Sequence, residues 1–310
     1  MSAPDPARQA AWVRRPERSN MAMLRVMTWI SLRLGRPVAR GVLFGITLYF
    51  LFLAPVARRA SRAYLRRALG QVPRLRELFW HFHTFATCIH DRVYLLNDRL
   101  ALFDIQVHGA AALEAVLAAG RGAFLLGAHM GSFEVIRAVG RQRLGLRVAM
   151  VMYENNAIKI NAALAAINPA SVQDIIPLGQ LDSMLQVRAR LDEGMVLGML
   201  GDRTLDDDPT LSVQFLGSSA AFPVGPMRLA AILGRPVFFM TGLHLGGNRY
   251  AIHFEPLADF TGIERTGRDA AIREAVAAYA ASLARHCRGA PYNWFNFFDF
   301  WRAPAGGGRA

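Results

Sequence analysis

A histidine and a glutamate stand close together in the segment Gly-Ala-His-Met-Gly-Ser-Phe-Glu, which covers residues 127–134. His129 and Glu134 are five residues apart, so on one unbroken helix they would point about 140° apart around its axis. They can cooperate only if His129 lies on a turn and Glu134 lies in the first turn of the helix that follows. A carboxylate there would hold the imidazole in one tautomer, and its other nitrogen could then take a proton from an attacking hydroxyl group. The spacing therefore predicts general-base chemistry by His129, with Glu134 orienting it.

The residues between His129 and Glu134 suit that arrangement. Ser132 is of a type that caps helices, and Gly131 relieves crowding in a turn. The segment also follows the apolar run AFLLGA, and open α/β sheets place their sites where strands end. On local chemistry alone a structural alternative stays open, because a first-turn glutamate meets the helix dipole and a histidine at a strand end is often hydrogen-bonded core. Ser132 lacks a Gly-x-Ser-x-Gly elbow, so we do not interpret it as a nucleophile.

Asp202 and Arg203 form a second polar pair, directly after the apolar run MVLGML. If that run is a strand, both residues open onto the same edge of the sheet as His129. Arg203 would be suited to meet a substrate phosphate, and the alternative is a local ion pair with the aspartates at 206–208. No His or Glu adjoins those three aspartates, so we expect a solvated acidic loop and no metal site.

The remaining histidines and cysteines have a structural interpretation. The histidines of the His-Phe-His segment at 81–83 lie with His90 in an aromatic, helical pattern. Cys88 and Cys287 belong to no Cys-x-x-Cys pair and cannot make a disulfide framework. We therefore expect no structural zinc, and a reducing cytoplasmic environment is the easiest fit.

The sequence changes rhythm near residue 98. Residues 1–20 have the character of a mobile basic leader, and residues 21–97 show helical periodicity with no clear strand. From 98 to 302 short apolar runs alternate with alanine-rich helical stretches, and 303–310 is a flexible, glycine-rich tail. Runs such as AFLLGA and VAMVMY suit strands buried on both faces. This pattern predicts an α/β domain with a mixed, largely parallel central sheet covered by helices on both faces.

Positive charge is concentrated at the N-terminus. The formal net charge is +13, and residues 1–70 carry thirteen arginines against Asp5 and Glu17. Residues 41–57 form an uncharged run between arginines, GVLFGITLYFLFLAPVA, which a nucleic-acid-binding arm does not need. As one helix it would reach about 25 Å, slightly short of a hydrocarbon core of roughly 30 Å. We therefore expect a membrane-associating segment that either spans the bilayer or lies in the interface, with its arginines on anionic headgroups; a buried core helix is the alternative.

Taken together, these motifs resemble the glycerolipid acyltransferase superfamily, and within it the late acyltransferases of lipid A biosynthesis. GAHMGSFE matches the histidine and acid motif of the superfamily. The strand with its aspartate (MVLGMLGDR), the proline and glycine turn (AFPVGPMRLA) and the C-terminal aromatic segment (PYNWFNFFDFW) follow in the order of that branch. The resemblance covers residues 25–301.

The resemblance implies a membrane-associated acyltransferase at the cytoplasmic face of the bacterial inner membrane. It would move a fatty acyl group from a thioester, on acyl carrier protein or coenzyme A, to a hydroxyl or amine of a lipid or glycolipid. His129 and Glu134 would be catalytic, and Gly131, Ser132, Asp202 and Arg203 would bind substrate, with backbone donors near Gly131 or the Arg203 side chain stabilising the oxyanion. No metal, organic cofactor or nucleic acid is expected.

Two segments depart from the lipid A pattern. NPASVQDIIPLG, at 168–179, lacks the arginine usual for that branch, and Phe297 and Phe298 replace its paired C-terminal arginines. The absence of these arginines weakens the prediction that a lipid A precursor is the acceptor, and it affects the prediction of acyl transfer less. The alternatives are a non-catalytic membrane adaptor with a degenerate transferase fold and a nucleotide-binding protein with Glu154 on the ribose, although GAHMG is not a Gly-x-Gly-x-x-Gly turn.

Overall fold

The computed structural model describes residues 21–143, 145–168, 174–178, 182–204 and 208–301. The expected leader at 1–20 and the expected tail at 303–310 lie outside the described residues.

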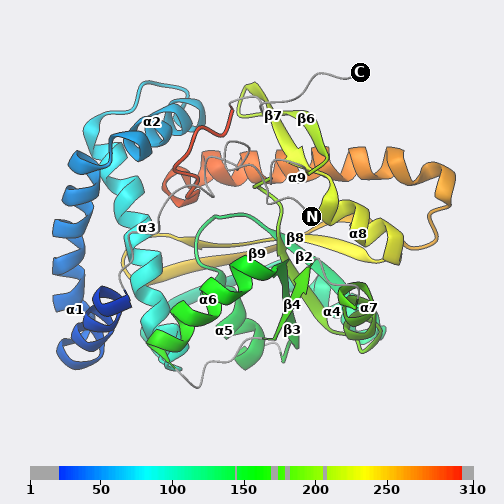
Figure 1. Cartoon of the computed structure of the whole chain (residues 1–310), viewed down its shortest axis with the longest axis horizontal. Helices are drawn as coiled ribbons and strands as arrows, with labels where there is room; N and C mark the ends of the chain where they lie inside the picture. The colour runs from blue at the N-terminus through cyan, green and yellow to red at the C-terminus, as the bar shows by residue number, and fades with distance from the viewer. Residues whose placement is uncertain (1–20, 144, 169–173, 179–181, 205–207, 302–310) are drawn as a thin grey trace, which may run out of the picture.

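A seven-stranded mixed sheet forms the centre of the fold (Figure 1). Its strands, in spatial order, are β1 (Asp104–His108), β9 (Arg249–Asp259), β8 (Pro236–His244), β2 (Ala123–Gly127), β5 (Val196–Leu200), β3 (Val148–Tyr153) and β4 (Ile175–Leu178). All neighbouring strands run parallel except β8 and β9, which form an antiparallel pair. The predicted α/β fold with a mixed, largely parallel sheet is confirmed.

Helices cover both faces of this sheet. They are α4 (Ala110–Ala118), α5 (Phe133–Arg143), α6 (Glu154–Ile167), α7 (Ser183–Asp192), α8 (Gly225–Leu233) and α9 (Arg268–Gly289). In Figure 1, α9 lies on one side of the sheet and α5 on the other. Alternate residues of β2 enter different cores: Phe124 and Leu126 pack in the cluster that contains α9, and Leu125 packs in the cluster that contains α5. The run AFLLG is apolar throughout because both of its faces are buried.

Smaller elements complete the domain. A separate antiparallel hairpin is formed by β6 (Thr210–Phe215) and β7 (Ser218–Pro223). The described residues also contain the short 3₁₀ helices η2 (Leu100–Leu102), η3 (Arg265–Gly267) and η4 (Pro291–Asn293).

Between Met21 and Leu96 the structure describes three α-helices that precede the α/β part: α1 (Met21–Leu53), α2 (Pro55–Leu69) and α3 (Leu75–Leu96). They lie together at one end of the molecule (Figure 1). The expectation of one continuous apolar helix over 41–57 is wrong, because α1 ends at Leu53 and α2 begins at Pro55. Proline has no backbone N–H and disfavours helical geometry in the residue before it, and Ala54 accordingly leaves the helical region (φ −119°, ψ 69°).

One face of α1 is buried and the opposite face is apolar and exposed. Buried residues recur at every fourth position: Ala39, Leu43, Thr47 and Leu51. On this side Thr47 contacts His83 of α3, with 3.2 Å between Oγ1 and Nδ1. Large apolar side chains are exposed on the other side, namely Val38, Val42, Leu48, Phe52 and Leu53. By length and composition alone, residues Val26–Leu53 form a helix able to cross a membrane.

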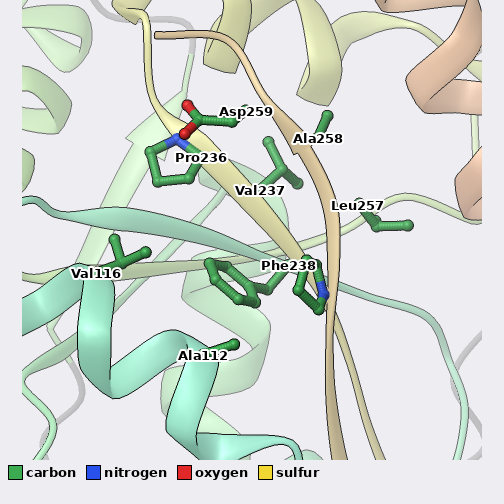
Figure 2. Close-up of a pocket in the computed structure, with 9 residues that line it drawn as sticks. Ala112, Val116, Pro236, Val237, Phe238, Leu257, Ala258 and Asp259 are labelled. Atoms are coloured by element: carbon green, nitrogen blue, oxygen red, sulfur yellow. The ribbon is translucent and has the colours of Figure 1, made fainter.

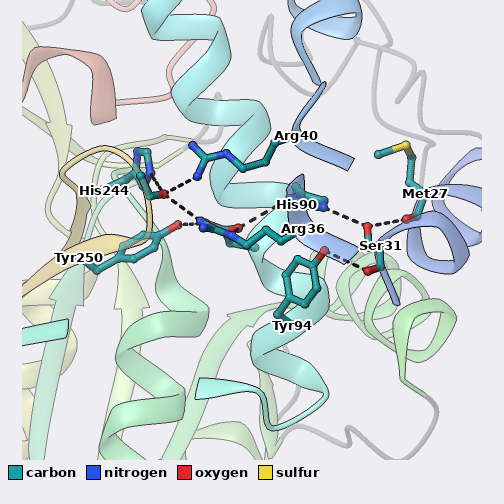
Figure 3. Close-up of polar contacts among 10 residues, drawn as sticks. Met27, Ser31, Arg36, Arg40, His90, Tyr94, His244 and Tyr250 are labelled. Carbon is teal, nitrogen blue, oxygen red and sulfur yellow. Dashed lines mark hydrogen bonds and ion pairs between the residues drawn. The ribbon is translucent and has the colours of Figure 1, made fainter. Parts of the chain in front are cut away.

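A buried ion pair fixes α1 to the rest of the fold (Figure 3). Just after a kink at Gly35 (φ 81°), the Arg36 guanidinium donates two hydrogen bonds of 2.9 Å to the buried Asp91 carboxylate of α3. Tyr250 of β9 donates a third at 2.9 Å. Burial alone would raise the pKa of Asp91, but its contacts with His90, Arg36 and Tyr250 lower that pKa. Asp91 therefore stays charged and ties α1, α3 and β9 together.

Arg36 and Arg40 also donate to the carbonyl oxygen of Gly247, at 2.8 and 2.7 Å, in the turn between β8 and β9. The N-terminal helices are thus held at the end of the sheet where β8 finishes.

We predict that Asp91→Ala lowers the free energy of unfolding by about 3 kcal/mol, because it leaves the largely buried Arg36 charge without its partner. Denaturant titration of the detergent-purified protein measures this. Glu193→Ala is the matched control, since its ion pair with Arg147 is exposed and should change stability by less than about 1 kcal/mol. Equal effects of the two substitutions would show that the buried pair has no special part in docking α1.

Candidate active site

His129 lies on a tightly built turn between β2 and α5. Gly131 has a φ of +65°, and a Cβ there would lie 2.1 Å from the carbonyl oxygen of Gly242 in β8, so only glycine fits. The Ser132 N–H donates to that same carbonyl at 2.8 Å. The Ser132 hydroxyl accepts a hydrogen bond from the Val135 N–H at 3.3 Å, which confirms the predicted helix cap. This turn presents His129 at the carboxyl end of β2.

The imidazole of His129 is held by Asp202, which follows the adjacent strand β5. His129 Nδ1 and Asp202 Oδ1 are 2.8 Å apart. The parallel register pairs Gly127 of β2 with Leu200 of β5, so the two residues that follow the strands meet at one sheet edge. The Asp202 side chain is fully buried, and that of His129 is 28% exposed.

Three further donors surround the other oxygen of Asp202. Oδ2 accepts hydrogen bonds from the His129 N–H at 3.0 Å, from Trp294 Nε1 at 2.9 Å and from Asn296 Nδ2 at 2.8 Å. Burial alone would raise the pKa of Asp202, but the charge and hydrogen bond of His129, together with the charge of Arg203, lower that pKa to about 2. The carboxylate is therefore ionised at neutral pH.

This environment determines the form of His129. An ionised carboxylate only accepts, so Nδ1 carries the imidazole proton and Nε2 is the unprotonated nitrogen. Burial lowers the pKa of His129 and the charge of Arg203 lowers it further, while Asp202 acts in the opposite direction; the net pKa is below 6.5. Among the described residues, none forms a hydrogen bond with Nε2. His129 is thus a neutral, oriented base at neutral pH.

Glu134 has a different partner from the one expected. It lies in the first turn of α5, as predicted, but its carboxylate is 2.8 Å from Nε of Arg92 on α3 and is largely buried. The role that the sequence assigned to Glu134, holding the imidazole through one of its nitrogens, belongs to Asp202, which contacts Nδ1. Spacing along the chain did not reveal the contact between His129 and Asp202, because β5, which lies beside β2 in the sheet, is some 70 residues away in sequence.

The backbone N–H groups near Gly131, which we expected to stabilise the oxyanion, already donate hydrogen bonds within the protein. The Gly131 N–H donates to the Asn293 carbonyl at 2.8 Å, and the Met130 N–H points back to the Ala128 carbonyl at 2.6 Å. Ser132 is 2% exposed, and its hydroxyl caps α5. The Gly131 N–H and the Ser132 hydroxyl thus make contacts within the protein, and substrate binding by these two residues stays a prediction.

Arg203 lies at the same edge as His129, as predicted from the strand MVLGML. Its Nε donates to Asn296 Oδ1 at 2.8 Å, and its guanidinium carbon lies 5.6 Å from the centre of the Phe298 ring. Of the acidic loop, Asp208 accepts a hydrogen bond from Tyr153 at 3.0 Å; residues 206 and 207 lie outside the described part.

Sequence reasoning missed the roles of Trp294 and Asn296. In the sequence, the segment PYNWFNFFDFW stands out only by its resemblance to the C-terminal aromatic segment of the family. The sequence did offer a signal for these roles. The indole N–H of Trp294 and the amide of Asn296 lie in an otherwise aromatic segment, and buried polar groups need hydrogen-bond partners.

No group of three or more His, Cys, Asp or Glu side chains within the described residues is arranged to hold a metal ion. Cys88 and Cys287 are buried free thiols whose pKa values are raised by burial. The side chain of Glu154 is not described; the residue begins α6.

An apolar pocket of about 380 Å³ lies at the opposite end of the sheet (Figure 2). Its lining includes Val237 and Phe238, which pair with Phe124 and Leu125 at the beginning of β2. His129 follows the other end of that strand, so this pocket is separate from the candidate active site.

Comparison with known families supports an enzymatic interpretation of this site. The family model for bacterial lipid A biosynthesis acyltransferases matches residues 18–303. The chain belongs to this family. No curated protein sequence matches the chain significantly. As a member of the lipid A biosynthesis acyltransferase family it is an acyltransferase that acts on lipid, and the resemblance drawn from GAHMGSFE and the later motifs is confirmed.

We predict that His129 titrates below 6.5 in NMR spectra of its ring nitrogens, because burial disfavours the imidazolium. In Asp202→Asn the pKa of His129 should fall further, since the carboxylate that favours the charged ring is gone. In Arg203→Gln it should rise, because a repelling positive charge is removed. A His129 pKa above 6.5 in the unmodified protein would contradict this description of the site.

Proposed function

We propose that this protein transfers a fatty acyl group from an acyl thioester to a hydroxyl or amine of a lipid or glycolipid, with His129 as general base and Asp202 as the residue that orients it. The observation that carries the proposal is the 2.8 Å contact between Nδ1 of His129 and Oδ1 of Asp202, in a histidine side chain that is 28% exposed. Because the carboxylate only accepts, this contact leaves Nε2 as the nitrogen able to take a proton. Family membership independently supports the reaction class.

The transfer proceeds by direct attack. Nε2 takes the proton from the acceptor hydroxyl as its oxygen bonds to the thioester carbonyl carbon. The carbon–sulfur bond then breaks and the electron pair leaves on sulfur, which takes the proton from the imidazolium and departs as a thiol. Asp202 stabilises the imidazolium between these steps, in the manner of the carboxylate of a hydrolytic triad.

Arg203 supplies positive charge at the same sheet edge and is suited to stabilise the oxyanion, because the backbone N–H groups of the turn are already used. Glu134 has a supporting role in this mechanism: its ion pair with Arg92 fixes the start of α5 against α3. The donor is an acyl carrier protein or coenzyme A thioester, and no metal or organic cofactor enters the mechanism.

Mutation of the two acidic residues separates this proposal from the pairing predicted by sequence. We expect His129→Ala to abolish acyl transfer, and Asp202→Asn to lower kcat by about 10³-fold or more, because the asparagine amide favours the wrong tautomer. Glu134→Gln should lose far less activity. The measurement is transfer of a radiolabelled acyl group to membrane lipid, with folding checked by circular dichroism. An inactive Glu134→Gln beside an active Asp202→Asn would overturn the assignment, as would a fully active His129→Ala.

We also propose that the N-terminal helices place the site at the cytoplasmic face of the inner membrane. The exposed apolar face of α1 suits lipid. On α2, Arg59, Arg62 and Arg66 are exposed at spacings of three and four, which is one helix face. Residues 21–76 contain no acidic residue. A basic helix beside an apolar one is suited to an anionic headgroup layer.

Replacing Arg59, Arg62 and Arg66 together by Gln should therefore reduce the preference for anionic over zwitterionic vesicles. The expected loss is about 1 kcal/mol per arginine, while apolar binding by α1 to both kinds of vesicle remains. Vesicle flotation in low salt measures it. The control replaces Arg147, Arg188 and Arg285, which are exposed and paired with acids elsewhere. An unchanged lipid preference, or an equal loss in the control, would refute the assignment of α2.

A further inference from the structure

The C-terminal segment Asn293–Asn296 crosses the sheet edge that carries the catalytic pair. The Asn293 side chain pairs with the backbone of His244 at the end of β8, accepting at 2.8 Å and donating at 3.1 Å. Its carbonyl accepts from the Gly131 N–H, and the Phe295 N–H donates to the His129 carbonyl at 2.7 Å. We call residues 293–296 the C-terminal strap, since its backbone joins the ends of β2 and β8.

Two side chains of the strap reach the carboxylate that orients His129. Trp294 Nε1 and Asn296 Nδ2 donate to the same oxygen of Asp202, at 2.9 and 2.8 Å. The amide oxygen of Asn296 accepts from Arg203 Nε at 2.8 Å. Asn296 therefore links the cationic side chain at the site to the carboxylate.

Trp294 is itself held by the N-terminal helices. Its ring is fully buried and lies 4.9 Å from that of Tyr64 in α2, centre to centre. Its carbonyl oxygen is 2.7 Å from Nε2 of His81 in α3, and His81 Nδ1 is 2.8 Å from the Ser61 hydroxyl of α2. Because a carbonyl only accepts, His81 donates from Nε2 and its Nδ1 accepts from Ser61. Burial lowers the pKa of His81 to about 4, so this arrangement persists at neutral pH.

We propose that Trp294 and Asn296 are positioning residues for acyl transfer, which orient the Asp202 carboxylate toward His129 and connect it through His81 to the membrane-facing helices. This inference rests on the proposed function of the His129 and Asp202 pair. It adds a role for the strap that neither the histidine motif nor the strand aspartate contains.

The physical effect of the strap is twofold. Two neutral donors fix the rotation of the carboxylate, so that its other oxygen meets Nδ1. They also stabilise the carboxylate charge, which weakens its attraction for the imidazolium. Removing a donor should therefore lower kcat and raise the pKa of His129, so that the acid limb of the kcat/KM profile moves to higher pH.

Trp294→Phe and Asn296→Ala test the proposal, because phenylalanine keeps an aromatic ring at the position and removes the indole N–H together with the five-membered ring that carries it. We expect kcat to fall about tenfold or more in each, with a smaller change in KM, and the acid limb to shift upward. Trp301→Phe and Asn248→Ala are the matched controls: their side chains donate to the carbonyls of Phe215 and Leu102 and not to Asp202. Both controls should keep the activity and pH profile of the unmodified protein.

A double-mutant cycle distinguishes positioning from general destabilisation. If Trp294 acts through the carboxylate, Trp294→Phe should cost little further activity once Asp202→Asn is present. Additive losses, or a lower kcat with an unshifted pH profile, would overturn the inference, and thermal unfolding reports whether each variant is folded. If His129→Ala retains full transfer, the proposed function itself fails; if only the strap variants behave like their controls, the proposed function stands and this inference alone fails.

Discussion

The candidate site depends on one buried charge, the carboxylate of Asp202. A charge removed from water is costly unless hydrogen bonds replace its solvation. Here one oxygen accepts from His129 Nδ1, and the other accepts from the His129 backbone, Trp294 and Asn296. These donors come from the end of β2 and from the C-terminal strap, whereas Asp202 follows β5. The Asp202 charge therefore requires three parts of the chain that are distant in sequence to lie together, and the same arrangement orients the imidazole of His129.

The N-terminal helices are built into this arrangement. His81 of α3 binds the carbonyl of Trp294, and Arg36 and Arg40 of α1 bind the turn between β8 and β9. The apolar face of α1 and the basic face of α2 are thus tied by hydrogen bonds to the same sheet edge as the His129 and Asp202 pair. For an enzyme that acts on lipid, such coupling would keep the base at a constant place relative to the lipid surface.

Local patterns predicted most of the fold and part of the site. The strands AFLLG and VAMVMY were evident because burial on both faces demands uninterrupted apolar residues. The cap at Ser132 followed from its place before a helix. The prediction of a continuous helix over 41–57 was wrong, because it followed the apolar composition of the run, whereas Pro55 ends the helix locally. The pairing of His129 with Glu134 rested on their spacing and on the resemblance of GAHMGSFE to a family motif, and neither says which strands are neighbours.

The sequence by itself determined that His129 stands at the end of a buried strand, that the fold is α/β and that the chain resembles an acyltransferase of lipids. Hydrophobic periodicity and short motifs indicate these properties, and both depend on residues that are close together in the chain. Only the tertiary structure decided that Asp202 orients His129, that Glu134 binds Arg92, and that Trp294 and Asn296 complete the solvation of the carboxylate. The reason is physical: a buried charge takes whatever donors the packed fold brings within about 3 Å, and those donors are set by strand order rather than by distance along the sequence.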